Sequence, residues 1–242
     1  MSLTPDTDGL TANLSPSERS LVVEQNLYYD VYLPSHVTSN APLALVLHGY
    51  GGSKRQMMRE ARQFVPADFA IAAVQGIHQH IRAPTEAGAP LRFGFGWLTN
   101  FQTQESTRLH HQTLLRIIDT LAGENLIDPK RIFLVGFSQS VALNYRFAFT
   151  HTEVLRGVVG ICGGLPGDLE TSDAYRNTDA DMLHLCGATD EIYTPARTAD
   201  YETRLRRFAS RAEVRHFAQA AHVITDAMRA DLRAWLSERG AS

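Results

Sequence analysis

The sequence predicts a single-domain α/β fold, with a mainly parallel, twisted β-sheet and helices on both of its faces. Several short apolar runs, such as the one at 42–49, are typical of strands that are buried on both faces of a parallel sheet. Segments with helical periodicity alternate with these runs. The chain has 242 residues, of which 44% are hydrophobic and 20% charged, and this size and composition suit one globular domain.

The expected elements follow one another without a linker or an internal repeat. Two β-prone runs on either side of Gln25 and Asn26 predict a hairpin near the start. Residues 77 to about 105 are expected to form an irregular loop, which in a compact domain is usually functional or mobile. About twenty residues separate the strands expected at 154–164 and 181–188, so no separate lid domain is predicted. The other expected elements are strands at 42–49, 69–76, 131–138 and 214–219, and helices at 53–64, 107–121, 141–149, 194 to about 211, and 224–238.

Composition also bounds the partners and the location of the protein. Residues 1–20 are polar and are expected to form a flexible tail ahead of an α/β domain at 21–242. They resemble no secretory signal, and no stretch reaches the ~18 apolar residues of a membrane span. The net charge of −3 provides no basic surface for nucleic acid. We therefore expect a cytoplasmic protein with a small-molecule partner, no nucleic acid and no membrane span, and the oligomeric state stays open.

The segment GFSQS at 136–140 stands directly between an expected strand and an expected helix. This is the place of a nucleophile elbow, G-x-S-x-G, in which a sharp turn holds the serine Oγ above the sheet. Ser138 is therefore the predicted nucleophile. Ser140 replaces the last glycine, so the close approach of strand and helix is expected to be strained but possible. Taken alone, the serine could equally be a helix cap.

The segment HGYGG at 48–52 follows the strand at 42–49 and predicts an oxyanion hole. In enzymes with such an elbow, one backbone N–H comes from the residue after the nucleophile and another from a glycine-rich loop of this kind. The predicted donors are the N–H groups of Tyr50 and Gln139, and Gly49 is expected to border the substrate. An ordinary glycine-rich turn is the alternative.

An acid and a base follow in the order that this class of hydrolase uses, Ser, Asp, His. Asp190 comes just after the strand at 181–188, and His222 comes after the strand at 214–219. The carboxyl ends of parallel strands meet at one edge of a sheet, where such sheets build their sites. His222 is the predicted base and Asp190 the acid that orients it, with Glu191 as the rival acid.

The remaining histidines and the two cysteines carry no predicted chemistry. His110 and His111 are expected on the solvated face of a helix, and His184 within its strand. The sequence lacks the Cys and His clusters of a zinc site, so no metal and no cofactor are predicted. Cys162 and Cys186 are expected to be buried, reduced thiols.

With these residues in place, the chain resembles the phospholipase/carboxylesterase family, which includes the acyl-protein thioesterases. The likeness is carried by LHGYGGS (47–53), DPKRIFLVGFSQS (128–140), GGLPGD (163–168), LCGATDEIYTP (185–195) and AAH (220–222). The resemblance implies a lidless α/β-hydrolase that cleaves carboxylic esters or thioesters, with Ser138, Asp190 and His222 as its triad and donors at Tyr50 and Gln139. Ser140 and Tyr50 depart from the family pattern and leave the substrate open.

Three kinds of function compete: a serine esterase, a non-catalytic protein on this fold, and a related hydrolase of another substrate class, of the dienelactone-hydrolase or peptidase type. A serine esterase would attach the acyl group to Ser138. The aromatic residues of the loop at 77–105, namely Phe93, Phe95 and Trp97, would form an apolar wall beside the acyl group or a small satellite core. In the same loop, Arg82 and Arg92 could bind an anionic part of the substrate, or could simply be solvated. A non-catalytic ligand-binding or receptor protein on this fold should lack a triad member, and a dienelactone-hydrolase relative should carry Cys at the elbow. A peptidase-type relative should have additional substrate-binding elements.

Overall fold

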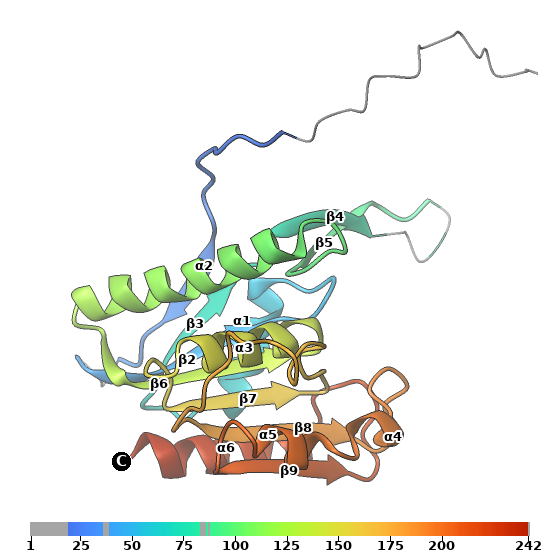
Figure 1. Ribbon diagram of the computed structural model, residues 1–242. Coiled ribbons are helices and arrows are strands. Elements are labelled where there is room, and N and C mark those ends of the chain that lie inside the picture. Colours follow the sequence, from blue (N-terminus) through green and yellow to red (C-terminus); the bar gives the residue numbers. More distant parts are fainter. Residues whose placement is uncertain (1–18, 36–38, 83–85, 87, 242) are drawn as a thin grey trace, which may run out of the picture.

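The computed structural model describes residues 19–35, 39–82, 86 and 88–241, and most of the predicted tail at 1–20 lies outside them. Among the described residues, seven strands form one sheet in the order β1-β3-β2-β6-β7-β8-β9 (Figure 1). Only β1 runs antiparallel to its neighbour, β3. The mainly parallel sheet is therefore as predicted. The bounds are β1 Tyr29–Tyr32, β2 Ala41–Leu47, β3 Ala70–Val74, β6 Ile127–Phe137, β7 Gly157–Ile161, β8 Asp181–Gly187 and β9 Ala212–Phe217.

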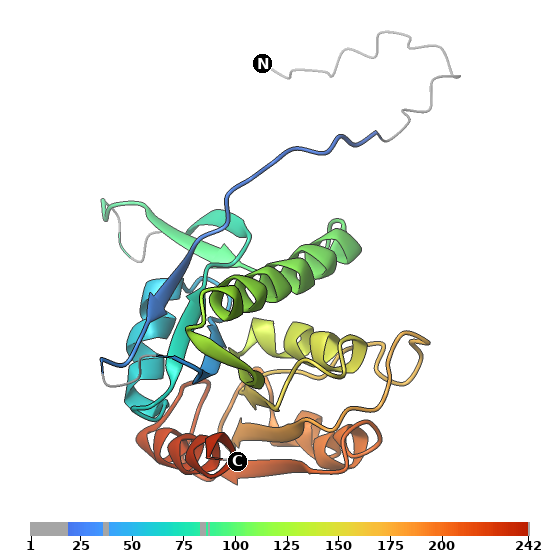
Figure 2. The same ribbon diagram turned by 90° about the vertical axis from the view of Figure 1, so that its left-hand side faces the viewer.

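Helices cover both faces of the sheet (Figures 1 and 2). On each face, a separate hydrophobic layer lies between the helices and the strands. One layer packs α2 (Thr103–Gly123), α3 (Gln139–Thr150) and Leu205 of α5 (Tyr201–Leu205) against the sheet. The other contains the apolar side chains of α1 (Lys54–Phe64) and α6 (Asp226–Gly240). The short α4 (Pro195–Thr198) precedes α5. The strands between these layers are buried on both sides, which is why their sequences are continuously apolar.

Local sequence fixes where α1 and α6 begin. Ser53 caps α1 by accepting a hydrogen bond from the Gln56 N–H (3.4 Å), and Thr225 caps α6 by accepting one from the Met228 N–H (3.3 Å). Both helices occur where they were predicted. Within the described residues, no helix has the length and apolar composition that crossing a membrane requires.

The hairpin predicted around Gln25 and Asn26 is wrong. Residues 19–28 form no strand, and only Tyr29–Tyr32 joins the sheet, antiparallel to β3. A strand needs a neighbour for its backbone groups, and β1 finds that neighbour in β3 rather than in the residues that precede it. The β-prone side chains of Leu21, Val22 and Val23 are consequently exposed.

The irregular loop predicted for 77–105 is also wrong. Two strands, β4 (His78–Arg82) and β5 (Arg92–Gly96), pair antiparallel in a hairpin beside the main sheet (Figure 1). The glycines that suggested a loop permit close packing instead, since a Cβ on Gly94 would lie 2.9 Å from the Cα of Gly51. The helix after the hairpin also begins at Thr103, earlier than predicted. The helix predicted from 194 to about 211 is broken into α4 and α5.

Candidate active site

Ser138 sits at a strained turn between β6 and α3. Its backbone has φ 56° and ψ −114°, a combination that a residue other than glycine adopts only when its surroundings enforce it. The Ser138 N–H donates to the Ile161 carbonyl at the end of β7 (2.9 Å). The turn also needs Gly136, where a Cβ would lie 2.5 Å from Nδ2 of Asn144. The predicted elbow therefore has the backbone shape expected of a nucleophile elbow.

Three predicted side chains meet at the carboxyl edge of the sheet. The Ser138 Oγ lies 2.9 Å from Nε2 of His222, and Nδ1 of His222 lies 2.9 Å from Oδ2 of Asp190. These residues follow β6, β9 and β8 respectively, so the parallel strand order brings together groups that are 32 and 84 positions apart in the chain. The rival acid Glu191 has an exposed side chain outside this contact chain.

Asp190 is held as a buried carboxylate. Its side chain has no exposed surface, and its Oδ1 accepts hydrogen bonds from the N–H groups of Ile192 (2.8 Å) and Tyr193 (2.9 Å). Burial alone would raise the pKa of Asp190, but the bonds from Tyr193, His222 and Ile192 outweigh it and lower that pKa below its ordinary value. The carboxylate is therefore ionised at neutral pH and available to His222.

The loop 48–52 passes directly beside the serine. A Cβ on Gly49 would lie 2.9 Å from Cδ1 of Phe137 and 3.2 Å from the Cβ of Ser138, so a side chain at this position would crowd the elbow. Among the described residues, the N–H groups of Tyr50 and Gln139 have no protein acceptor. Both are therefore free to donate to a ligand next to Ser138.

His48 fixes the start of this loop. Its Nε2 accepts from the Gly76 N–H (3.0 Å), so its Nδ1 carries the proton and donates to the Gly49 carbonyl (2.7 Å). Burial lowers the pKa of His48 to about 4, although the bond to Gly49 opposes the shift. His48 is therefore neutral near pH 7 and keeps this tautomer. Its part in shaping the site was not foreseen from the sequence.

The predicted aromatic wall is divided between the interior and the surface. Trp97 is fully buried, and its Nε1–H donates to the His48 carbonyl (2.7 Å), so it supports the loop rather than lining an open wall. Phe93 is exposed on the hairpin, and Phe95 is half-buried beside Gly52. The prediction of a shared acyl wall is wrong for Trp97, because its indole faces the core.

The side chain of Gln139 joins the elbow to the end of the hairpin. Its Oε1 accepts from the Trp97 N–H and its Nε2 donates to the Leu98 carbonyl, each at 2.9 Å. Sequence reasoning used only the backbone of Gln139. The reciprocal amide contact spans about forty positions, so no local pattern could have indicated it.

Two aromatic rings flank the histidine of the site. Phe137 lies 5.0 Å and Tyr193 5.9 Å from the His222 ring, measured between ring centroids. Tyr193 was missed at the sequence level, although its position three residues after Asp190 was a usable signal. Together, the two rings limit the orientations of the imidazole.

A model of the phospholipase/carboxylesterase family matches residues 34–238, most of the chain. The chain belongs to the phospholipase/carboxylesterase family. The resemblance drawn from the sequence motifs is thereby confirmed.

Curated relatives of this family member are distant. The chain is 29% identical over 128 residues to NocK of Nocardia uniformis subsp. tsuyamanensis, a protein that carries the name of an esterase. That match covers 52% of this chain and 33% of NocK. The matched part spans about a third of the curated relatives' length.

Solved structures share the fold over nearly their whole length. A carboxylesterase from Bacillus cereus superposes with a TM-score of 0.67 at 18% identity, covering 88% of this chain and 94% of that one. A carboxylesterase from Mesorhizobium loti gives 0.67 at 20% identity, covering 90% and 98%. The predicted single-domain α/β-hydrolase fold is confirmed.

In this phospholipase/carboxylesterase chain, Ser140 stands at the last position of the elbow, where the family usually has glycine, and its side chain fits there without a clash. Its side chain is buried, its Oγ accepts from the Phe137 N–H (3.1 Å), and it lies 3.2 Å from the Leu47 carbonyl, to which it can donate. Tyr50, the other departure, is exposed and stacks on His80, with ring centroids 4.5 Å apart.

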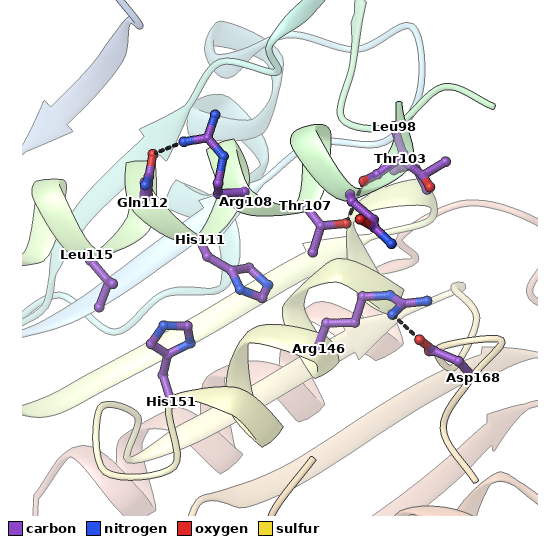
Figure 3. A pocket seen from close by; sticks show the side chains of 11 residues that line it. Leu98, Thr103, Thr107, Arg108, His111, Gln112, Leu115, Arg146, His151 and Asp168 are labelled. Atoms are coloured by element: carbon purple, nitrogen blue, oxygen red, sulfur yellow. Dashed lines mark hydrogen bonds and ion pairs between the residues drawn. The ribbon is translucent and has the colours of Figure 1, made fainter. Parts of the chain in front are cut away.

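A cavity of about 730 Å³ lies elsewhere in this family member, between α2 and α3. Figure 3 shows His111 of α2 facing His151, which follows α3, with Arg146 paired to Asp168 at one side. None of the predicted site residues lines it. Within the described part of the chain, no group of three or more His, Cys, Asp or Glu residues is placed to hold a metal ion.

The buried imidazoles next to this cavity correct a sequence expectation. His110 is fully buried rather than solvated, and its Nε2 lies 3.2 Å from Oδ1 of Asn144. The inner face of α2 includes position 110, so the ring packs under the helix. His184 and both cysteines are buried as expected, and the cysteines are unpaired.

Proposed function

We propose that this chain hydrolyses carboxylic esters through an acyl-enzyme on Ser138. The observation that carries the proposal is the unbroken contact from the Ser138 Oγ through the His222 imidazole to the buried Asp190 carboxylate. Family membership supports ester hydrolysis as the reaction class.

Each group has a distinct task in the proposed mechanism. Nε2 of His222 accepts the Ser138 proton as Oγ attacks the ester carbonyl, and then returns it to the departing alcohol. Asp190 keeps the other imidazole proton on Nδ1 and stabilises the imidazolium. Water repeats the sequence on the acyl-enzyme, which releases the acid and restores Ser138.

The oxyanion formed during attack would lie between two backbone donors. Gln139 N–H is at the first position of α3, where the helix dipole favours negative charge, and Tyr50 N–H approaches from the facing loop. The constraints from His48 and Trp97 support this proposed role, because they hold the loop in place before substrate binds. Thioesters carry the same carbonyl and are included as substrates.

Labelling with a fluorophosphonate probe tests the nucleophile. We expect one label per chain at Ser138 and its loss in Ser138→Ala, with turnover of a short activated ester falling by on the order of 10⁴–10⁶-fold. Ser237 is an exposed serine on α6, and Ser237→Ala is the control. This variant should keep both the label on Ser138 and the wild-type turnover. Wild-type turnover in Ser138→Ala would refute the assignment. Parallel assays on oxygen esters and thioesters of matched acyl chains would set the preference.

A further inference from the structure

Two arginines face each other across the β4–β5 hairpin. Arg82 and Arg92 are direct cross-strand partners, so their side chains leave the same face of the hairpin. Both are exposed, and neither has an acidic partner among the described residues. Glu86, which is described between the two strands, forms no ion pair with either of them. Like charges directly opposite one another weaken strand pairing, so this arrangement does not stabilise the hairpin itself.

The pair is held next to the proposed oxyanion loop. A Cβ on Gly51 would lie 3.6 Å from Nε and 3.8 Å from Cζ of Arg82, so the guanidinium rests against the residue that follows Tyr50. Backbone bonds tie the loop to the hairpin, from the Gly51 N–H to the Phe95 carbonyl (2.9 Å) and from the Phe95 N–H to the Gly52 carbonyl (3.2 Å). Arg82 therefore keeps a fixed place relative to the loop that carries Tyr50, and Arg92 lies directly opposite it on the neighbouring strand.

A further cation lies on the other side of Ser138. The Arg197 guanidinium covers the Tyr193 ring at 4.6 Å, and that ring stacks on His222. In the part of the chain that the structure describes, Arg197 has no carboxylate partner. Glu191, an exposed acidic residue, lies six positions earlier in the chain. Arginine charge thus stands on two sides of a site whose own carboxylate, Asp190, is buried.

We propose that Arg82 and Arg92 bind a negatively charged group of the substrate, so that the esters preferred at Ser138 are anionic. The chemistry recognised is that of a carboxylate or a phosphate, either of which a guanidinium binds through paired charge-assisted hydrogen bonds. This inference rests on the proposed esterase function. It adds the class of substrate and assigns the hairpin as the element that selects it.

The test compares pairs of similar esters in which one member carries a negative charge and the other is neutral. One pair places the charge on the acyl side, mono-para-nitrophenyl glutarate against para-nitrophenyl valerate. A second pair places it on the leaving group, para-acetoxybenzoate against its methyl ester. The quantity measured is the ratio of kcat/KM for the charged ester over the neutral one in each pair. Inhibition by glutarate and by inorganic phosphate distinguishes the two kinds of anion.

We expect the ratio in one of the pairs to fall about fivefold in Arg82→Gln and in Arg92→Gln, the upper end for an exposed ion pair, and further in the double variant. The effect should shrink at high salt, because exposed charges are screened. Arg116→Gln, an exposed arginine on α2 whose guanidinium has no partner among the described residues, removes the same charge and should leave the ratio at the wild-type value.

The outcomes separate this inference from the function on which it rests. Ratios that stay at the wild-type value in both pairs, with all esters still cleaved, would overturn the anion site and leave the esterase intact. An equal fall in Arg116→Gln would also overturn it, since net charge alone would then explain the effect. A wild-type protein that cleaves none of the four esters would refute the esterase function and this inference with it.

Discussion

Replacing Asp190 by asparagine should nearly abolish turnover although it preserves the shape of the side chain. In the structure, Oδ1 of Asp190 receives two backbone N–H groups and Oδ2 faces His222. The amide oxygen of the variant must take the Oδ1 position, because an NH₂ group there would face two donors. The NH₂ group then points at Nδ1 of His222, which has to accept. The imidazole proton moves to Nε2, and Nε2 can no longer take the proton of Ser138.

The expected loss is about 10⁴-fold in kcat, as for the same change in another Ser-His-Asp enzyme. That factor corresponds to about 5.5 kcal/mol of activation free energy. It exceeds what the loss of a single hydrogen bond would cause, because the wrong tautomer removes the base altogether. The fold should survive, since the two N–H groups that Oδ1 accepts keep their partner.

Stopped-flow or steady-state assays of para-nitrophenyl acetate hydrolysis measure the effect on turnover. Circular dichroism checks that the variant is folded. Glu191→Gln is the matched control, because it removes the neighbouring exposed carboxylate, which does not contact His222. A folded Asp190→Asn protein within tenfold of wild-type turnover would refute the tautomer argument. A larger loss in Glu191→Gln than in Asp190→Asn would transfer the orienting role to Glu191.

Two further predictions concern stability. Gly136→Ala should lower the free energy of unfolding by about 1–3 kcal/mol in urea titrations, because its Cβ would collide with Asn144, whereas Gly123→Ala, with open space around its Cβ, should not destabilise the fold. Burial, together with the charge of His216, lowers the pKa of His184 to about 3, so the unfolded chain binds a proton there that the folded chain does not. Stability should therefore fall as pH drops below about 6.5, by up to ~1.4 kcal/mol per pH unit, and His184→Gln should reduce that slope in urea titrations between pH 6 and 4. An unchanged slope would mean that the folded chain also protonates this ring.

The sheet could be predicted because each central strand carries its signal within a few residues. All seven residues of Ala41–Leu47 are buried, and an unbroken apolar run of that length, in a chain with alternating helices, is typical of a strand covered on both faces. The proposed triad was predicted by the same reasoning. Once β6, β8 and β9 are parallel neighbours or near neighbours, the residues just after them share one edge, whatever their separation in the sequence.

The hairpin was missed because its strand signal is weak and its glycines suggested a loop. Phe93 and Phe95 do alternate with Gly94 and Gly96 at the two-residue period of a strand. The other strand, His78–Arg82, contains a single apolar residue, Ile81, so the two strands together did not indicate a hairpin. Their pairing is supported by contacts with the loop at 49–52, which lies far away in the sequence. The burial of His110 escaped prediction for a related reason, since its partner Asn144 belongs to another helix.

The elements that escaped prediction are those that hold the proposed oxyanion loop. The His48 side chain donates to the Gly49 carbonyl, and the Trp97 indole donates to the His48 carbonyl. The side chain of Gln139, the residue after Ser138, accepts from the Trp97 N–H. These hydrogen bonds link the hairpin, the loop and the residue that follows Ser138. Because burial lowers the pKa of His48 to about 4, its imidazole stays neutral near pH 7 and this arrangement does not change when the proposed reaction takes place at neutral pH. A charged substrate bound by Arg82 would therefore be positioned by the same framework that positions the Tyr50 N–H. Selection of the substrate and stabilisation of its oxyanion would then depend on one rigid unit.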